Sequence, residues 1–252
     1  MRLHVLSDLH LERGIAEMPS PDADVVVLAG DISTGTRGVE WARAWAGARP
    51  VIYVAGNHEF YGHAMPGLIA DLRAAAAGSS VHVLERDEVT IDGVRFLGCT
   101  LWSDFEFDGA DHRELSMRVC ERAVSDYHVI HNGSADRVLR AQDTRELHVA
   151  SRRWLAGRLA DVHAGPTVVV THHSPYISWR PPQEVLRLIA GAFVSDLSEL
   201  MDGERARLWV YGHTHRWADI DVAGTRLLSN PCGYPNEPVA GYDPAFVVDV
   251  QL

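Results

Sequence analysis

Cysteine is scarce in this sequence, and its scarcity excludes one common way of stabilising a fold. Only three cysteines, Cys99, Cys120 and Cys232, stand among 252 residues. Three widely separated thiols cannot form the disulfide framework of a small secreted domain. We therefore expect reduced cysteines in a cytoplasmic protein.

Long apolar runs are missing as well. A helix that crosses a bilayer needs about 20 consecutive apolar residues, and no stretch of the sequence approaches that length. Residues 1–8 carry polar side chains within their apolar part, which a secretory signal peptide does not. The sequence therefore predicts no membrane partner and no export signal.

Positive charge is in deficit, with 23 Lys and Arg against 34 Asp and Glu and a formal net charge of -11. A broad basic face for duplex nucleic acid is therefore not expected, although small nucleotides stay open as ligands. The composition, 46% hydrophobic and 23% charged, is that of a globular protein. Without a linker, repeat or low-complexity run, residues 1–252 are expected to form one domain, and the oligomeric state is left open.

Short apolar runs alternate with helical patterns along the chain. Such alternation predicts βαβ units. Turns centred on Asp92-Gly93 and Ala223-Gly224 predict antiparallel hairpins as well. The mixture favours an α/β protein with two packed sheets. Strands are predicted at 2–6, 24–29, 51–55, 81–84, 167–171, 209–211 and 246–250, and helices at 39–48, 68–77, 114–127 and 144–162.

Metal-binding side chains follow five of the predicted strands. Because ligands of such sheets gather at the carboxyl ends of the strands, we expect these residues to converge. In an extended segment, residues two apart point the same way, so the two members of a spaced pair could aim at one spot. Imidazole, carboxylate and amide groups are ligands of divalent cations. The residues are Asp8 and His10, Asp31, Asn57 and His58, His172 and His173, and His213 and His215.

The set is too large for one cation, which takes about four to six ligands, and about right for two. Two metals about 3.5–4 Å apart serve phosphoester hydrolysis, because they acidify a shared water and clamp the phosphoryl oxygens. Nitrogen and oxygen donors suit Mn, Fe, Zn, Co or Ni. The sequence therefore predicts two divalent or transition metal ions without deciding among these elements.

The ordered motifs resemble those of the calcineurin-like metallophosphoesterase superfamily, over residues 8 to 215. The motifs are Asp8-x-His10, Gly30-Asp31, Gly56-Asn57-His58-Glu59, His172 and Gly212-His213-Thr214-His215. The resemblance implies a four-layer αββα sandwich, in which two mixed sheets are flanked by helices and the site lies at one edge.

The resemblance also implies a role for each residue. Asp31 would bridge the metals, and His58 would be the general acid near the leaving group. Glu59 would orient a histidine from outside the ligand shell. Thr34 stands where many protein phosphatases of the superfamily carry a second acid, so the sequence does not support a protein-phosphatase function. The first metal would take Asp8, His10 and His215, and the second Asn57, His172 and His213.

Other residues near these motifs are read more simply. Adjacent strand residues point to opposite faces, so His173 is expected to make a structural hydrogen bond or line the pocket instead of binding metal. Arg13 and Arg180 follow ligand segments and are candidates for contact with a substrate phosphate. Trp179 is expected in a loop near the site. The acidic segment from Asp104 to Asp111 is expected to be a solvated surface.

The expected function is metal-dependent hydrolysis of a phosphoester by in-line attack of a metal-bound hydroxide on phosphorus. The substrate would be a small phosphoester or nucleotide, handled by a phosphodiesterase or small-molecule phosphatase. Two alternatives stay open: a non-catalytic scaffold or binding module on the same fold, and a nuclease. The acidic balance and the lack of a basic appendage weigh against the nuclease.

Overall fold

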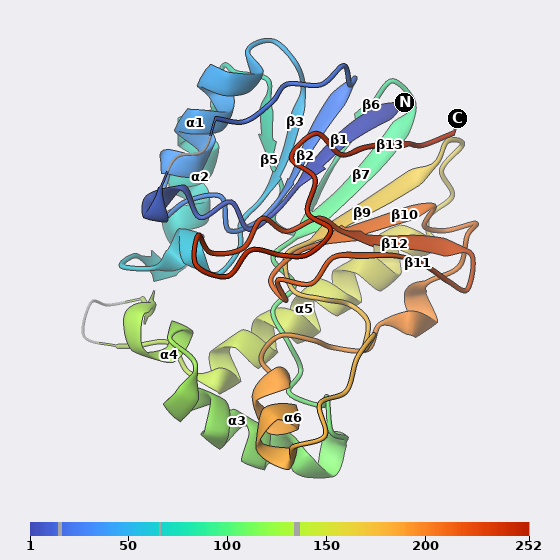
Figure 1. The fold of residues 1–252 in the computed structure, drawn as a ribbon. Helices are drawn as coiled ribbons and strands as arrows, with labels where there is room; N and C mark the ends of the chain where they lie inside the picture. Colours follow the sequence, from blue (N-terminus) through green and yellow to red (C-terminus); the bar gives the residue numbers. More distant parts are fainter. Residues whose placement is uncertain (15–16, 66, 134–136, 252) are drawn as a thin grey trace.

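Two mixed β-sheets lie face to face, and helices cover the outer face of each (Figure 1). The computed structural model describes residues 1–14, 17–65, 67–133 and 137–251. The four-layer αββα arrangement expected from the motifs is confirmed. Among the described residues, no helix is both long and apolar enough to cross a membrane.

The first sheet has five strands, and all but one of them run parallel. The exception is the C-terminal strand, which pairs antiparallel with the N-terminal one. The order across the sheet is β13 (Val247–Asp249), β1 (Arg2–Leu6), β2 (Val25–Ala29), β3 (Val51–Val54) and β5 (Val81–Val83).

The second sheet has six strands with a parallel centre and an antiparallel hairpin at each edge. The hairpins turn at Asp92-Gly93 and Ala223-Gly224, as the sequence predicts, and all four turn residues have positive φ. The order is β11 (Ala218–Val222), β12 (Thr225–Ser229), β10 (Leu208–Tyr211), β9 (Thr167–Thr171), β7 (Val94–Cys99) and β6 (Asp87–Ile91).

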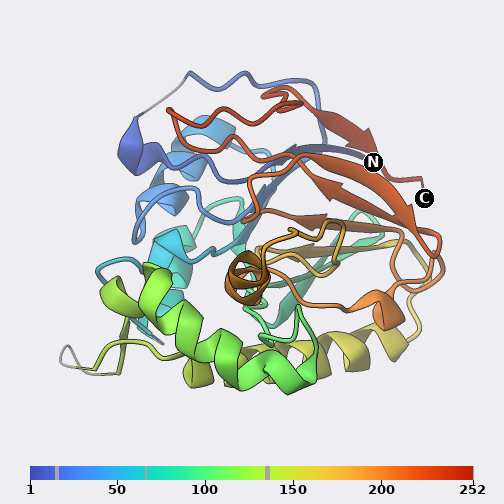
Figure 2. The same cartoon turned by 60° about the horizontal axis from the view of Figure 1, so that its bottom comes forward.

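Two groups of helices differ in what they cover (Figures 1 and 2). Helices α1 (Arg37–Ala46) and α2 (Gly67–Ala76) lie on the outer face of the first sheet, and α5 (Ala141–Ala160) on that of the second. Helices α3 (Arg113–Ala123), α4 (Asp126–Val129) and α6 (Glu184–Ala190) form a lower lobe. Within it, α3 contacts both α4 and α6. A short ribbon of β4 (Ala64–Met65) and β8 (His131–Asn132) accompanies them.

Strand alternation explains why the layers stack. In β2, Val25, Val27 and Ala29 face the second sheet, where they meet Val168 and Val210. The alternate residues of β2 face the helices, so both faces of the strand are buried. A strand between two apolar layers needs such a continuous apolar run.

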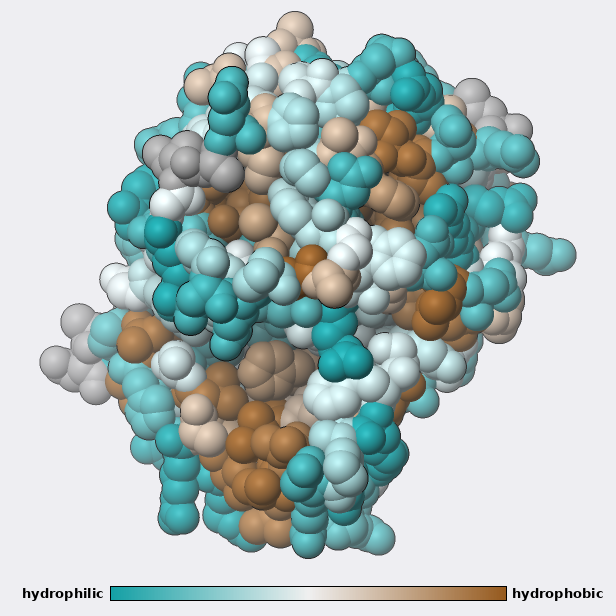
Figure 3. Space-filling view, viewed as in Figure 1, coloured by the Kyte–Doolittle hydropathy of each residue, from teal (hydrophilic) through white to brown (hydrophobic). Residues whose placement is uncertain are grey.

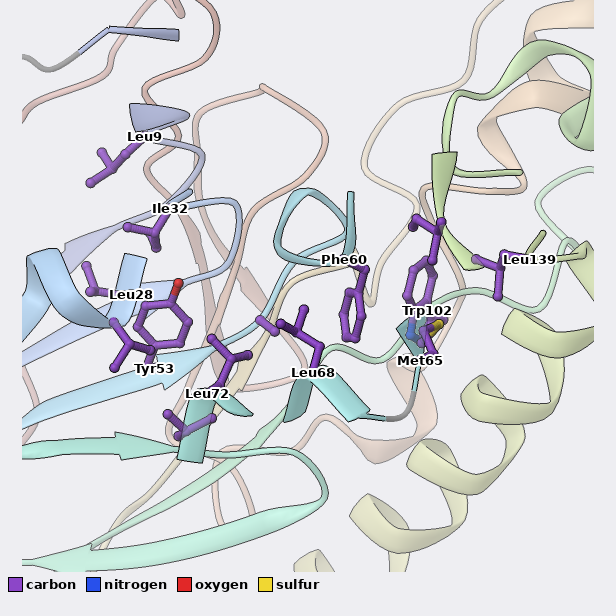
Figure 4. Close-up of a cluster of buried hydrophobic side chains, with 14 of the residues drawn as sticks. Leu9, Leu28, Ile32, Tyr53, Phe60, Met65, Leu68, Leu72, Trp102 and Leu139 are labelled. Atoms are coloured by element: carbon purple, nitrogen blue, oxygen red, sulfur yellow. The ribbon is translucent and has the colours of Figure 1, made fainter. Parts of the chain in front are cut away.

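The core between the first sheet and its helices continues toward the lower lobe. Figure 4 shows it running from Leu28, Tyr53 and Leu72 to Phe60 and Trp102. These side chains are at most 3% exposed. The same core therefore ties the first sheet to the segment that leads into the lower lobe.

Two predicted helices differ from the observed ones. The helix predicted over 114–127 breaks at Val124, whose backbone is extended, and this break brings Asp126 into the buried interior. The helix predicted over 144–162 spans Ala141–Ala160 and buries a stripe that includes Thr144, His148 and Ser151. Ala150 and Val162, two apolar residues within the predicted range, are exposed. Polar residues that pack in the interior mislead a reading based on hydrophobic spacing.

A pair of leucine-to-alanine variants tests the core. Leu72 in α2 is fully buried, whereas Leu115 in α3 is 39% exposed. We expect Leu72→Ala to lower the free energy of unfolding by about 2–5 kcal/mol, because it leaves a cavity. Leu115→Ala should change it by no more than about 0.5 kcal/mol. Urea denaturation followed by circular dichroism measures the free energy of unfolding of both variants. Equal losses in the two variants would contradict the difference in burial between Leu72 and Leu115.

Candidate metal centre

The parallel strands of both sheets end at one edge of the sandwich, and the predicted ligands follow these ends. Three side-chain groups there have candidate ligand atoms within 4.8 Å of one another. Asn57 joins the third group, since its Oδ1 lies 3.0 Å from His172 Nε2. The structure thus brings every predicted ligand into one cluster. The groups are Asp8, His10 and His215; His10, Asp31 and His58; and Asp31, His172 and His213.

Backbone conformation, not strand alternation, aims these side chains. His213 and His215 have φ of 67° and 48°, so they lie in a left-handed turn instead of an extended segment. Asp8, His10 and Asp31 are also left-handed. Non-glycine residues adopt this region at an energetic cost, and such strain gathers at functional sites. The extended geometry predicted for the spaced pairs was therefore wrong, whereas the predicted gathering of these residues at the carboxyl ends of the strands is present.

Hydrogen bonds across the two sheets hold the site together. His172, after β9, lies with Nδ1 2.9 Å from the carbonyl oxygen of Ala29 in β2, so this nitrogen donates. The His213 amide, after β10 of the same sheet, likewise donates to Asp8 Oδ1, after β1 of the first sheet, at 2.9 Å. Gly212 makes room for this contact, because a Cβ there would lie 2.5 Å from Asp8 Oδ2.

One group of acceptor atoms faces a single point. Because Nδ1 of His172 donates to Ala29, its Nε2 is the atom that faces the cluster. That Nε2 lies 3.0 Å from Asn57 Oδ1, 3.1 Å from His213 Nδ1 and 3.3 Å from Asp31 Oδ1. Nitrogen and oxygen lone pairs that converge in this way need a cation, either a proton or a metal, between them.

Asp126 fixes the direction of the Asn57 amide. Asn57 Nδ2 donates to Asp126 Oδ1 at 2.8 Å, and the Tyr61 hydroxyl donates to the same oxygen at 2.8 Å. These bonds turn Asn57 Oδ1 toward His172. Outer partners of this kind orient metal ligands and tune their affinity.

The second group of ligands meets on the other side of Asp31. His10 Nε2 and His215 Nε2 lie 3.1 Å apart, and Asp8 Oδ1 is 3.5 Å from His215 Nε2. Asp31 stands between the groups, with Oδ1 near His172 and Oδ2 3.9 Å from His10 Nε2. This placement suits a bridging carboxylate.

The charges of the cluster shift its pKa values in a consistent way. Burial alone would lower the pKa of His172, but the charge of Asp31 outweighs it and raises that pKa to about 10. Burial and the neighbouring His173 and His172 hold the pKa of His213 well below its usual range. In the metal-free protein, the proton on His172 thus supplies the positive charge that the converging acceptors need.

The donor set fits divalent cations. Asp8 Oδ2 is buried and has no hydrogen-bond partner within the described part of the chain. Buried polar atoms normally have partners. Imidazole nitrogens with carboxylate and amide oxygens form a set typical of first-row transition metals.

His58 is held by groups that sequence reasoning missed. Its Nδ1 lies 2.9 Å from Glu12 Oε1, and its Nε2 lies 3.1 Å from the Tyr234 hydroxyl. Burial would lower the pKa of His58, but the charges of Asp31 and Glu12 outweigh burial and raise it. His58 thus retains a proton more readily than an isolated histidine.

Glu59 does not have its expected contacts. The amides of Asp31, Ile32 and Gly56 donate to its carboxylate at 2.7–3.0 Å, and the Tyr53 hydroxyl donates at 2.8 Å. Glu59 therefore ties the turn after β2 to the turn after β3, whereas the sequence predicted that it would orient a histidine.

The structure shows the contacts of three residues whose roles the sequence left undecided. His173 Nδ1 donates to the Thr100 carbonyl oxygen at 3.1 Å, so its structural hydrogen bond is present. Arg13 lies with its guanidinium 4.3 Å from the centre of the Tyr234 ring, at the site. Arg180 instead pairs with Asp108.

The acidic segment is less solvated than predicted. Arg180 and Arg187 both pair with Asp108, whose side chain is 13% exposed. Arg113 pairs with Glu106. Two carboxylates of this segment, Glu106 and Asp108, thus join the lower lobe through ion pairs.

A pocket of about 400 Å³ opens over the cluster. Its lining includes Asp31, His58 and His213 of the cluster, together with Asp126 and Tyr234. A volume of this size admits a small ligand. The lining of this pocket therefore includes candidate ligands.

Three residues of the site were not identified from the sequence, and the sequence signal for them differs. Glu12 extends the two-residue spacing of Asp8 and His10, so a longer reading of that motif would have included it. Tyr234 directly follows Gly233, whose amide donates to the Asp8 carbonyl at 3.0 Å. Asp126 has no local motif, and only the packing of the lower lobe reveals it.

Comparison with protein families matches residues 1–217 to the calcineurin-like phosphoesterases. The chain belongs to this family, and it is accordingly a metal-dependent phosphoester hydrolase. This membership agrees with the resemblance of its motifs.

Individual relatives are more distant. The chain is 25% identical over 215 residues to the uncharacterized protein L509 of Acanthamoeba polyphaga mimivirus, covering 79% of this chain and 73% of that one. The phosphopantetheinyl hydrolase PptH of Mycobacterium tuberculosis has a similar fold, with a TM-score of 0.69, 22% identity and coverage of 93% and 90%. A dimetal phosphatase of Danio rerio also has a similar fold, with a TM-score of 0.53, 16% identity and coverage of 96% of this chain and 90% of that one.

A charge-removing variant tests the link between Glu12 and His58. We expect Glu12→Gln to lower the pKa of His58 in the metal-free protein, because one of the negative charges that raise it is lost. His58 would then lose its proton at a lower pH. NMR titration of the imidazole measures the change, and Glu40→Gln, on the exposed side of α1, is the control. An unchanged pKa would refute the link.

Proposed function

We propose that this protein uses two divalent cations to hydrolyse a small phosphoester, as a phosphodiesterase or small-molecule phosphatase. The convergence of His172 Nε2, Asn57 Oδ1 and His213 Nδ1 carries the proposal, because imidazole nitrogens and an amide oxygen this close together form a ligand set typical of divalent cations. These residues would hold one cation. Asp8, His10 and His215 would hold the other, with Asp31 shared between them.

The chemistry follows from these assignments. When bound, two divalent cations activate water as a nucleophile and neutralise charge on the phosphoryl oxygens. Asp126 orients Asn57, and Glu59 holds the turn that carries Asp31. The chain thus supplies ligands whose directions are fixed before substrate binds, which lowers the cost of reorganisation.

His58 is the proposed general acid. Its proton is stabilised by Asp31 and Glu12, and its Nε2 faces the pocket beside the Tyr234 hydroxyl. A group in this position can protonate the departing oxygen of the substrate. Its Nδ1 contact with Glu12 fixes the direction of the ring.

Comparison of substrates tests this function. Rates on mono- and bis-p-nitrophenyl phosphate with added Mn²⁺ separate monoesterase from diesterase activity. A second panel holds cyclic nucleotides, dinucleotides and a phosphopantetheinyl ester, the last because the fold neighbour from M. tuberculosis is a phosphopantetheinyl hydrolase. No turnover of any phosphoester with any divalent metal would revive the scaffold alternative.

Removing the shared carboxylate should remove both metal and activity. We expect Asp31→Asn to abolish turnover and to lower the metal content, because a neutral amide bridges two cations poorly. Asp22→Asn is the matched control, since Asp22 is 96% exposed on its side chain. Elemental analysis after dialysis measures the metal. Two ions per chain in Asp31→Asn would contradict the bridging role.

Removing the proposed acid should spare the metals. We expect His58→Ala to retain the wild-type metal content and to lose about 10²–10⁴ in kcat, the usual contribution of general acid catalysis. The loss should shrink for esters whose leaving group needs no proton. Steady-state rates over a series of leaving groups measure this, and an equal loss throughout would exclude His58 from the role.

A further inference from the structure

A second pocket, about 230 Å³ in volume, adjoins the pocket over the metal-ligand cluster. Ile189, Phe193 and Thr214 line both pockets, so the two are continuous. The remaining lining residues are Trp179, Leu186 and Ala190. Five of the six side chains that line the second pocket are apolar or aromatic, whereas carboxylates and histidines line the adjoining pocket.

Part of this apolar surface is open to solvent. Leu186 is 44% exposed, although it lies on the pocket wall. Figure 3 shows hydrophobic side chains around a hollow in the lower part of the molecule, where Figure 1 draws α6 and α3. Contiguous apolar surface that stays exposed is a common mark of a binding site.

The walls are fixed before any ligand binds. Trp179 packs against Phe107 with ring centroids 5.8 Å apart, and the Arg216 guanidinium lies 5.0 Å from the centre of the Trp179 ring. Phe107, Ala190 and Val194 form a small core of their own, separate from the three cores between the layers. This core supports the pocket without belonging to the sandwich.

Phe193 connects the two pockets physically. Its ring stacks on that of His213, a proposed metal ligand, with centroids 4.6 Å apart and an interplanar angle of 20°. A substrate whose phosphoryl group sits at the cluster can therefore extend its organic part over Phe193 and into the apolar pocket.

We propose that the apolar pocket binds an alkyl or aryl group of the phosphoester substrate. This inference rests on the proposed function, since it needs the phosphoryl group at the metal cluster. A strongly polar group fits poorly, because only the Thr214 hydroxyl and the Trp179 indole N–H among the lining side chains offer hydrogen bonds. Polar groups buried without partners cost free energy. The pocket thus selects substrates by the apolar part of the ester.

Alkylphosphonates test the pocket without requiring turnover. Methylphosphonate and butylphosphonate carry the same charged group and differ by three methylenes. A fully buried methylene strengthens binding about 4-fold. We expect the Mn²⁺-loaded protein to bind butylphosphonate at least about 10-fold more tightly than methylphosphonate in isothermal titration calorimetry.

Neighbouring residues of α6 supply matched variants. Leu186→Gln places a polar side chain in the pocket wall and should remove most of the preference for the butyl group. Val185→Gln is the control, because Val185 is 54% exposed on the same helix and does not line the pocket. It should keep the wild-type preference. Both positions are exposed, so neither variant should unfold the protein.

Each result separates the pocket from the metal site. Binding of methylphosphonate with no gain for butylphosphonate would overturn the apolar subsite and leave the proposed function standing. An equal gain in Leu186→Gln would also overturn it, because the butyl group would then lie elsewhere. No binding of methylphosphonate to the loaded protein would overturn the metal site and the subsite with it.

Discussion

The structure depends on the meeting of two sets of parallel strand ends at one edge of a β-sandwich. The bond from His172 to Ala29 and the bond from the His213 amide to Asp8 join the two sheets there. Neither sheet alone holds the full ligand set of either proposed cation, since each set takes residues from both sheets. The interlayer core that packs Val27 against Val168 therefore also sets the distances within the site. The contacts that stabilise the fold therefore also position the candidate metal ligands.

The cost of this arrangement is electrostatic. Asp31 and Glu59 are both buried, and burial together with the charge of Asp31 raises the pKa of Glu59. Inside the protein, amide donors and histidines offset the negative charge of these carboxylates, and bound cations would offset it further. Positive φ at Asp8, Asp31 and His215 adds conformational strain. The surrounding apolar layers supply the stability that allows the site to keep charge and strain in one place. The lower lobe then adds groups that the sandwich lacks, namely Asp126 beside Asn57 and the apolar wall beside Phe193.

Sequence reasoning worked where the signal was local. The apolar runs, the Asp92-Gly93 turn and the polar residues after each strand depend on neighbours in the chain, and the structure has them. It failed where a distant contact decides. The 114–127 helix is interrupted at Val124, close to Asp126, whose partner Asn57 lies 69 positions away in the chain. Glu59 contacts backbone amides of another turn, which its position in a motif does not reveal.

By itself, the sequence determined which strand ends carry donors and in what order, and hence the α/β class and the chemistry of the cluster. This follows because side-chain identity and hydrophobic period are properties of short segments. Only the tertiary structure decided which donors meet. His213 and His215 are two residues apart, yet left-handed backbone turns send them to different groups. The apolar pocket is likewise a product of packing, because its walls come from segments that adjoin only after the lower lobe has folded onto the sandwich.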